Sequence, residues 1–259
     1  IQKKAVPLEG PSSVFEQKPL PFGAYQPALG RVFTNGWEGT KGWWSPRRWR
    51  RKAWVFYGVY APDLIAGIAL VDVGYLAKAF CYLYLPASGY YCSNEESLRF
   101  GFQADFEAQP SGVWAFGDYQ LEKTATAWRL AYAGKRFEIA LEGADNAHGL
   151  GFLCPSKGAN RPFHYTYKNM LLPTKVNLHP NILCARTCDS LPGAVDYSKG
   201  FPPRNTTWNW ASFQGKLTDD TPFGINAVQH FNNGLENTLW IGGEQYALGA
   251  AQFDIQNPK

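Results

Sequence analysis

Three carboxylates in this 259-residue chain, Asp72, Asp196 and Glu236, stand in or beside apolar and aromatic sequence. A carboxylate that is buried in such sequence needs a partner or acquires a raised pKa. A buried acid beside aromatic walls could protonate an alkene or a leaving group, and the rings would shield the resulting cation. Asp196 and Glu236 are therefore the candidate catalytic acids. The same side chains could instead tie loops to the rim of the fold.

Other polar and aromatic side chains accompany these acids. Asp72 could contact a ligand, or it could cap a turn or pair with an arginine. Arg204 stands among prolines and tryptophans, so we expect it to be buried and paired with Asp196 or, as second candidate, Glu236. The remaining candidate ligand-binding residues are Tyr197, Trp208, Asn209, Trp210, Asn226 and Asn237.

Residues 202–215 carry a cation, three amides and two tryptophans on what we predict to be one extended strand. Side chains alternate between the faces of a strand, so Trp208 and Trp210 share one face. That face must be covered, either by core or by ligand. We therefore expect a cavity lined by at least one of these tryptophans and approached by Asp196, Arg204, Asn226 or Glu236. The alternative is a solid core with salt bridges at its rim.

The elements that must position these residues are predicted to be strands. Aromatic residues make up 16% of the chain, and 26 Gly and 18 Pro interrupt any long helix. Short alternating or apolar runs follow one another at regular spacing, which is typical of an antiparallel sandwich or barrel. The expected fold is all-β. Strands are predicted at residues 54–60, 65–73, 80–85, 99–107, 112–117, 127–133, 136–141 and 163–167, a loop at 142–160, and an irregular arm at 1–42.

The net charge is only +4, so no nucleic-acid partner is expected. The basic run from Arg47 to Lys52 could contact an anionic membrane surface, or it could be a solvated strand entry with arginine stems over tryptophan faces. No apolar run reaches membrane-spanning length. We predict a cytoplasmic protein.

Metal and cofactor motifs are not found in the sequence. Cys184 and Cys188 are four residues apart without a second pair, which argues against zinc. The five cysteines could form two disulfides, but five reduced thiols are favoured. There is no phosphate loop or nucleophile elbow, and His164 and His230 are interpreted as packing residues. We predict no cofactor.

The motifs in the second part of the chain resemble the microbial family called domain of unknown function 2804. They are 165–168, 195–200, 203–212, 224–226 and 236–243. More remotely, their order is similar to the carotenoid 1,2-hydratase and tocopherol cyclase superfamily, which implies two lipocalin-like barrel halves. Tyr197 and Lys199 replace the histidine and tryptophan of that superfamily's first motif, and Asn209 replaces the acid of its second. Hydratase chemistry therefore cannot be carried over from that superfamily.

The resemblance implies an N-terminal arm at 1–42, a first barrel half at 43–160 and a second half at 161–259. Residues 54–70 and 208–228 share a weak echo, which duplication or chance could produce. Such proteins are expected to continue with further strands after the 236–243 motif. Those strands would come from a longer chain or from a separate polypeptide.

Three functions remain open. The first is an enzyme that hydrates, cyclises or isomerises a hydrophobic, isoprenoid-like molecule by general acid catalysis. The second is a protein that only binds such a lipid-like ligand. The third is a carbohydrate-active hydrolase that uses a carboxylate pair.

Overall fold

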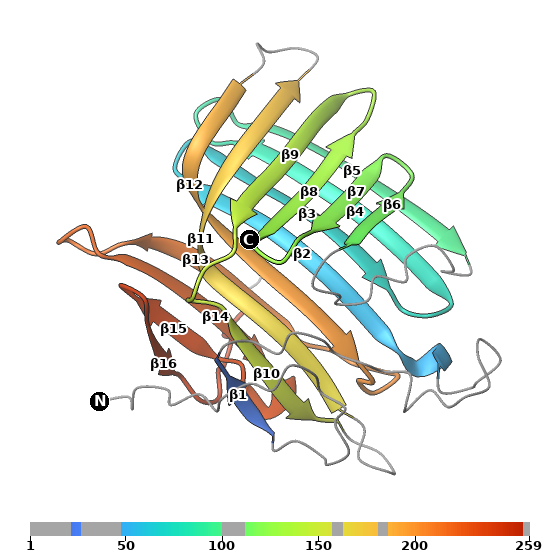
Figure 1. The fold of residues 1–259 in the computed structure, drawn as a ribbon, viewed down its shortest axis with the longest axis vertical. Helices are drawn as coiled ribbons and strands as arrows, with labels where there is room; N and C mark the ends of the chain where they lie inside the picture. Colours follow the sequence, from blue (N-terminus) through green and yellow to red (C-terminus); the bar gives the residue numbers. More distant parts are fainter. Residues whose placement is uncertain (1–21, 27–47, 100–111, 157–162, 181–185, 256–259) are drawn as a thin grey trace.

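A computed structural model describes residues 22–26, 48–99, 112–156, 163–180 and 186–255. Within these ranges the fold is all-β, as predicted, and every strand pair is antiparallel. Its strands form a main sheet of twelve and a small sheet of four (Figure 1). Two short 3-10 turns, η2 (Arg48–Arg50) and η3 (Asn232–Gly234), are the helical elements of the described part of the chain.

The main sheet runs from β5 at one edge to β6 at the other. Its strands, in order across the sheet, are β5 (Tyr90–Arg99), β4 (Leu76–Leu85), β3 (Leu64–Asp72), β2 (Lys52–Ala61), β12 (Arg186–Gly200), β11 (Phe163–Pro180), β9 (Phe137–Ala144), β8 (Ala127–Ala133), β7 (Tyr119–Lys123) and β6 (Gly112–Phe116). A branch consists of β10 (Leu150–Pro155), which pairs with β11, and β1 (Gly23–Tyr25), which pairs with β10.

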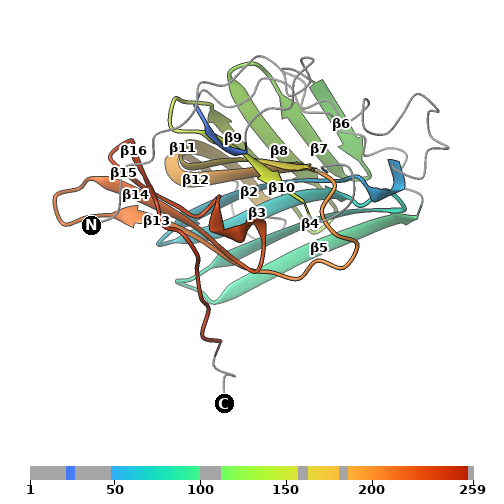
Figure 2. The ribbon, with the colours of Figure 1, turned by 90° about the horizontal axis from the view of Figure 1, so that it is seen from below.

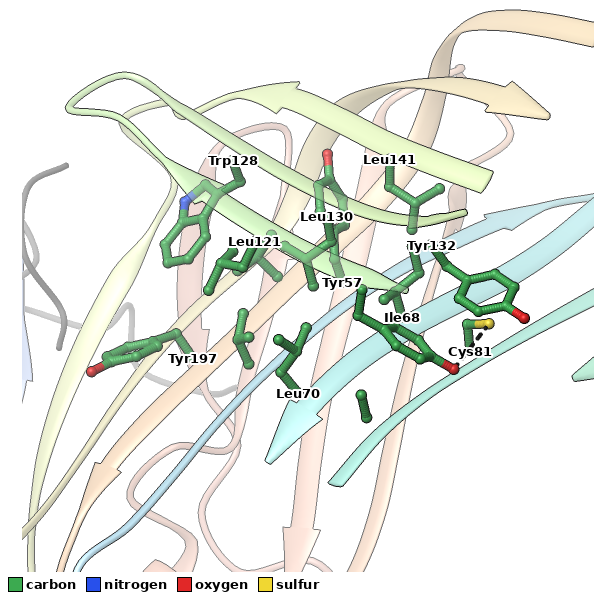
Figure 3. Close-up of a cluster of buried hydrophobic side chains, with 14 of the residues drawn as sticks. Tyr57, Ile68, Leu70, Cys81, Leu121, Trp128, Leu130, Tyr132, Leu141 and Tyr197 are labelled. Carbon is green, nitrogen blue, oxygen red and sulfur yellow. Dashed lines mark hydrogen bonds between the residues drawn. The ribbon is translucent and has the colours of Figure 1, made fainter. Parts of the chain in front are cut away.

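This sheet curls so that β6–β9 lie over β2–β5, as Figure 2 shows. The space between the two layers is a packed core. Tyr57, Ile68 and Leu70 point from one layer toward Leu121, Leu130 and Leu141 of the other (Figure 3), and all six side chains are buried. Side chains of the described strands thus pack against one another across the interior of the curled sheet.

The long strand β11 changes partners along its length. Its first part pairs with β10 and its last part with β9. Between them the ladder with β12 shifts register twice, near Asn169 and near Thr174. Bulges bend a sheet, and Pro173 opposite Pro192 lacks the N–H that a regular ladder requires. The bend lets β11 belong both to the curled layer and to the branch.

The small sheet is formed by β13 (Asn209–Lys216), β14 (Pro222–Gln229), β15 (Thr238–Ile241) and β16 (Glu244–Ala247). Met170, Ala194 and Trp240 pack in a second core where this sheet meets β10, β11 and β12. A Cβ on Gly224 would come within 2.6 Å of the Met170 carbonyl oxygen. The motif glycine at this position therefore permits the small sheet to lie directly against β11.

Most predicted strands lie in or largely overlap observed ones. The prediction of a loop throughout 142–160 was wrong, because Leu150–Pro155 is the buried strand β10. Its glycines resemble loop sequence, but a Cβ on Gly151 would come within 2.6 Å of the Tyr165 hydroxyl. They leave room for tyrosine rings of β11.

Two predicted strands and the predicted division into two halves remain to be compared with the structure. The extended strand predicted from residue 202 begins only at Asn209, because 201–208 form an irregular segment. Residues 100–107 of another predicted strand lie outside the described residues. Strands on both sides of residue 160 join the main sheet, and the division of the chain into two halves stays a prediction.

Candidate functional site

A cavity of about 510 Å³ lies between the outer face of the main sheet and the small sheet with its connecting loops. Alternation along β2 explains its position. Tyr57 and Val59 face the packed core of the curled sheet, whereas Trp54 and Phe56 line the cavity. Its other lining residues are Lys52, Val55, Ala69, Val71, Val73, Phe80, Tyr82, Lys168, Asp196, Pro202, Thr206, Trp208, Trp210, Val228, Phe231 and Glu236.

One cross-strand row carries charge into this apolar cavity. Lys168 of β11 lies opposite Asp196 of β12, and Asp196 lies opposite Phe56 of β2. The row continues through Ala69 to Phe80. Directly opposite side chains on one face of a sheet are close neighbours. The strand register therefore places a lysine and an aspartate beside an aromatic and aliphatic floor.

Lys168 bridges two carboxylates. Its Nζ lies 2.5 Å from Asp196 Oδ2 and 2.9 Å from Glu236 Oε2. The side chains of Lys168, Asp196 and Glu236 are each less than one-tenth exposed. We call these three residues the charged cluster. The cluster shares the cavity lining with Trp208 and Trp210, and the lysine at its centre was not predicted.

Burial lowers the pKa of the Lys168 ammonium, but the neighbouring Asp196 and Glu236 carboxylates outweigh that effect and hold the pKa above the ordinary lysine value. The remaining carboxylate oxygens also accept hydrogen bonds. Thr166 and Ser198 hydroxyls donate to Asp196 Oδ1 at 3.4 and 3.3 Å, and the Asn232 amide donates to Glu236 Oε1 at 2.6 Å. The cluster is thus a connected network and not an isolated ion pair.

Asn226 of β14 connects a tryptophan wall to the charged cluster. Its Oδ1 accepts a hydrogen bond from Trp210 Nε1 at 2.8 Å, and its Nδ2 donates to the Glu236 backbone carbonyl at 2.9 Å. The side chain is fully buried. Asn226 does not line the cavity, so its role is to position two residues that do.

Replacing Asn226 with alanine is expected to lower the free energy of unfolding by about 1–3 kcal/mol, because a buried indole N–H and a buried carbonyl lose their partner. Urea unfolding measures this loss, and the emission spectrum of Trp210 should shift as its N–H is released. Asn209→Ala is the matched control, since Asn209 is only half-buried and its amide bonds to Gln229. Equal losses in the two variants would contradict the positioning role.

Aromatic rings from both sheets form much of the cavity lining. Trp54 stacks on Trp208 with ring centroids 6.1 Å apart, and Phe231 lies 5.7 Å from Trp208. Trp210 meets Phe56 edge-on at 5.4 Å. Both predicted tryptophans line the cavity, although Trp208 precedes β13 and is 48% exposed.

His164 lies behind this aromatic wall. It is fully buried, stacks on Trp54 at 5.1 Å and meets Phe231 at 5.0 Å. Neither ring nitrogen has a hydrogen-bond partner among the described residues. Burial first, and then the nearby Lys168 and Lys52 charges, lower the pKa of His164 to about 3. The imidazole is therefore a neutral packing ring, as its sequence context suggested.

Arg204 does not behave as predicted. It is exposed, and no carboxylate contacts its guanidinium among residues that the structure describes. The prediction that it is buried and paired was wrong, because the segment around it is an irregular surface loop and not a covered strand. Asn209 also lies away from the cavity lining, at the start of β13.

Three further predicted side chains are buried away from the cavity lining. Asp72 pairs with Arg51 at 3.1 Å and accepts a bond from the Gly74 amide at 2.7 Å, which is the turn-capping and arginine-paired alternative. Tyr197 points into the core of the curled sheet (Figure 3). The Asn237 amide bonds to both backbone groups of Val228 and fixes the loop that carries Glu236. A direct contact between these residues and a ligand stays a prediction.

Sequence reasoning missed Lys168 and the aromatic residues Trp54, Phe56 and Phe231. A signal for Lys168 was present, because Thr166 and Lys168 alternate with Tyr165 and Tyr167 in a strand. A polar face of that kind, opposite the polar face of β12, indicates a site between sheets. The strand that pairs with the Lys168 strand could not be predicted from the spacing of residues in the sequence alone.

The described residues contain no group of three or more His, Cys, Asp or Glu side chains that could hold a metal ion. The described cysteines, Cys81, Cys92, Cys154 and Cys188, carry free thiols. In the basic run, Arg51 is buried against Asp72, while Arg47 lies outside the described residues. A membrane contact there stays a prediction. None of the helical segments described has the length and hydrophobicity to cross a membrane.

The family model described as domain of unknown function DUF2804 matches residues 27–259. The chain belongs to this family. The resemblance of its sequence motifs to the family of domain of unknown function 2804 is thereby confirmed. A search of curated proteins found no match.

Two solved structures are similar to this member of the DUF2804 family. Kievitone hydratase from Nectria haematococca has a TM-score of 0.53 and 9% identity, with 76% of this chain and 64% of that chain covered. A putative AttH from Nitrosomonas europaea has a TM-score of 0.49 and 15% identity, with 76% and 67% covered. This chain thus spans less than two thirds of the hydratase, and the likeness shows a shared fold alone.

Proposed function

We propose that this protein binds a hydrophobic, isoprenoid-like molecule in the cavity and protonates one of its double bonds. A single observation carries the proposal: a buried cluster of two carboxylates and one lysine lines an otherwise aromatic and aliphatic cavity. Charges are costly to bury, and buried titratable groups with specific charge partners in a cleft are candidates for functional residues. The name of the similar kievitone hydratase agrees with a hydration reaction.

The two carboxylates have different surroundings, which suggests different roles. Asp196 accepts bonds from Lys168 and from two hydroxyls. Glu236 has only Lys168 and the Asn232 amide. In our proposal Asp196 is the lasting counter-ion of Lys168, and Glu236 is the proton donor.

The proposed reaction begins when a protonated Glu236 carboxyl, formed from the resting carboxylate by proton uptake from water, transfers its proton to one alkene carbon, forming a C–H bond and leaving a cation on the other carbon. Trp54, Trp208 and Trp210 present π faces or edges around the cavity, and such faces stabilise a cation. Water then adds to the cation and loses a proton that restores Glu236. Loss of a neighbouring proton gives isomerisation instead, and attack by a second double bond gives cyclisation.

Proton transfer is tested in heavy water with a panel of prenyl alcohols and prenylated phenols. The wild type should place solvent deuterium on a carbon of the product, detected by mass spectrometry. Glu236→Gln should abolish incorporation while binding, followed by tryptophan fluorescence, stays within about threefold. Asp196→Asn should weaken both binding and turnover, because the lysine loses its counter-ion. Turnover by Glu236→Gln at the wild-type rate would overturn the assignment.

Binding in the cavity is tested separately by filling it. Val71 lines the cavity, so Val71→Trp should displace any small molecule that co-purifies with the wild type. Val113→Trp is the matched control, because Val113 is 61% exposed on β6. If both variants retain the same molecule, the cavity is not the binding site. If the Val113→Trp control retains the molecule and the wild type transfers no deuterium to it, the results instead support a protein that only binds a lipid.

A carbohydrate-active hydrolase is less well supported. Paired carboxylates in such enzymes leave space between them for the glycosidic oxygen or a water molecule. Here the Lys168 ammonium lies between Asp196 and Glu236 and contacts both. The surrounding walls are mainly apolar and aromatic, and we therefore place this function behind the other two.

A further inference from the structure

Lys52 is a second lysine of the cavity lining, and it is separate from the charged cluster. Its Nζ donates to the backbone carbonyls of Pro203 and Arg204 at 3.1 and 3.2 Å. An ammonium has three N–H donors, so one is left for another partner. No carboxylate pairs with Lys52 among the described residues. Within the part of the chain that the structure describes, Lys52 thus brings a half-buried positive charge to the cavity with no carboxylate in contact with it.

The register of β2 gives the separation between Lys52 and the charged cluster. Lys52 lies opposite Gly200, and Phe56 lies opposite Asp196. Four residues of extended strand separate the two rows, which corresponds to roughly 13 Å. Lys52 and the cluster therefore stand at the two ends of the cavity's β2 wall.

The wall between these ends carries no charge. Trp54 lies midway along it and is stacked on His164 and Trp208. His164 is neutral, because burial and the two lysines lower its pKa. A ligand lying along this wall would therefore meet an ammonium, then aromatic rings, then the cluster.

We infer that the ligand is an amphiphile whose anionic head group, a carboxylate or a phosphate, binds Lys52 while its unsaturated tail reaches the charged cluster. This inference rests on the proposed function and names its substrate class. Arg204 follows Pro203 in the loop that contacts Lys52 and is exposed there. It adds positive charge on the side from which an anion would approach.

The inference is tested on the full chain with five probes that share one tail: dodecanoate, dodecyl phosphate, dodecanol, dodecylamine and dodecyltrimethylammonium, each below its micellar concentration. Tryptophan fluorescence and calorimetry give the dissociation constants. We expect at least one anionic probe to bind about tenfold more tightly than dodecanol. The comparison of the two anionic probes distinguishes carboxylate from phosphate.

Variants assign that preference to Lys52. Lys52→Gln should make the anionic probes bind no better than dodecanol, and Lys52→Arg should restore most of the difference. Lys216→Gln is the control, because Lys216 is exposed beside the β13–β14 turn and pairs with Asp220. If Lys52→Gln does not fold, the inference is still tested by the ratio of the dissociation constants of dodecanol and the anionic probes, measured for the wild type and for Lys52→Arg.

Several outcomes overturn the inference. Equal binding of all head groups, tighter binding of the cationic probes, or an anion preference that survives Lys52→Gln would each do so. Failure of the proposed function is distinguishable. If dodecanol binds and Val71→Trp removes it, the cavity proposal stands even where the head-group inference fails. If none of the probes binds, both fail.

Discussion

Replacing Lys168 with methionine is expected to lower the free energy of unfolding by about 3–5 kcal/mol, the largest effect of any substitution considered. The variant leaves the Asp196 and Glu236 carboxylates buried without their shared ammonium. Methionine has a similar length, so lost packing contributes little. Urea unfolding at neutral pH measures the change, and Lys216→Met at an exposed lysine should change stability by less than about 0.5 kcal/mol.

A triple variant separates charge from shape. Lys168→Met combined with Asp196→Asn and Glu236→Gln removes all three formal charges, and it should recover most of the lost stability. A buried ionic group replaced by neutral groups of similar volume is often tolerated. If the triple variant is as unstable as Lys168→Met alone, the loss has a cause other than the unpaired carboxylates.

The sign of the pH dependence follows from the raised pKa of Lys168. A raised folded-state pKa contributes stability that is fully present below the unfolded lysine pKa of about 10.4 and is lost as pH rises through the folded value. The difference in the free energy of unfolding between the wild type and Lys168→Met should therefore stay constant from neutral pH up to the pKa of an unfolded lysine.

The second large effect is a loss of stability in acid that originates at His164. Its pKa is about 3 in the folded protein and about 6.5 in an unfolded chain. Between these values the unfolded state binds more protons, so stability falls as pH falls, by up to about 1.4 kcal/mol per pH unit. Phenylalanine cannot take up a proton. The stability difference between the wild type and His164→Phe should change with this slope.

The control for this experiment is His230→Gln, because His230 is exposed. Other groups also titrate in acid, so the relevant quantity is the difference between each variant and the wild type at every pH. A difference for His164→Phe that stays constant from pH 6.5 to pH 4 would contradict the buried, neutral imidazole.

Local sequence predicted the strands well, because alternation and turn residues are properties of neighbouring residues. The strands predicted at 54–60 and 65–73 are an example, since they are observed as the neighbouring strands β2 and β3. Gly149 and Gly151 misled the same reasoning. Their strand is stabilised by tyrosine rings on β11, and a distant partner of that kind has no local signal.

The site was predicted in its parts but not in its assembly. Asp196, Glu236, Trp208 and Trp210 were identified from residue type and context. Their meeting with Lys168 depends on the register between β11 and β12 and on the loop that follows β14. The prediction for Arg204 failed for a different reason. Its neighbours in the sequence suggested burial, but the backbone there is an exposed loop.

The position of the cavity has a consequence for how this family can diverge. Along β2 and β12, alternate side chains face two compartments: Tyr57 and Tyr197 belong to the packed interior, whereas Trp54 and Asp196 face the cavity. Folding and ligand choice are thus encoded on interleaved positions of the same strands. Selection can alter one set while the other stays constant, so relatives with the same interior can acquire different chemistry without rebuilding the scaffold.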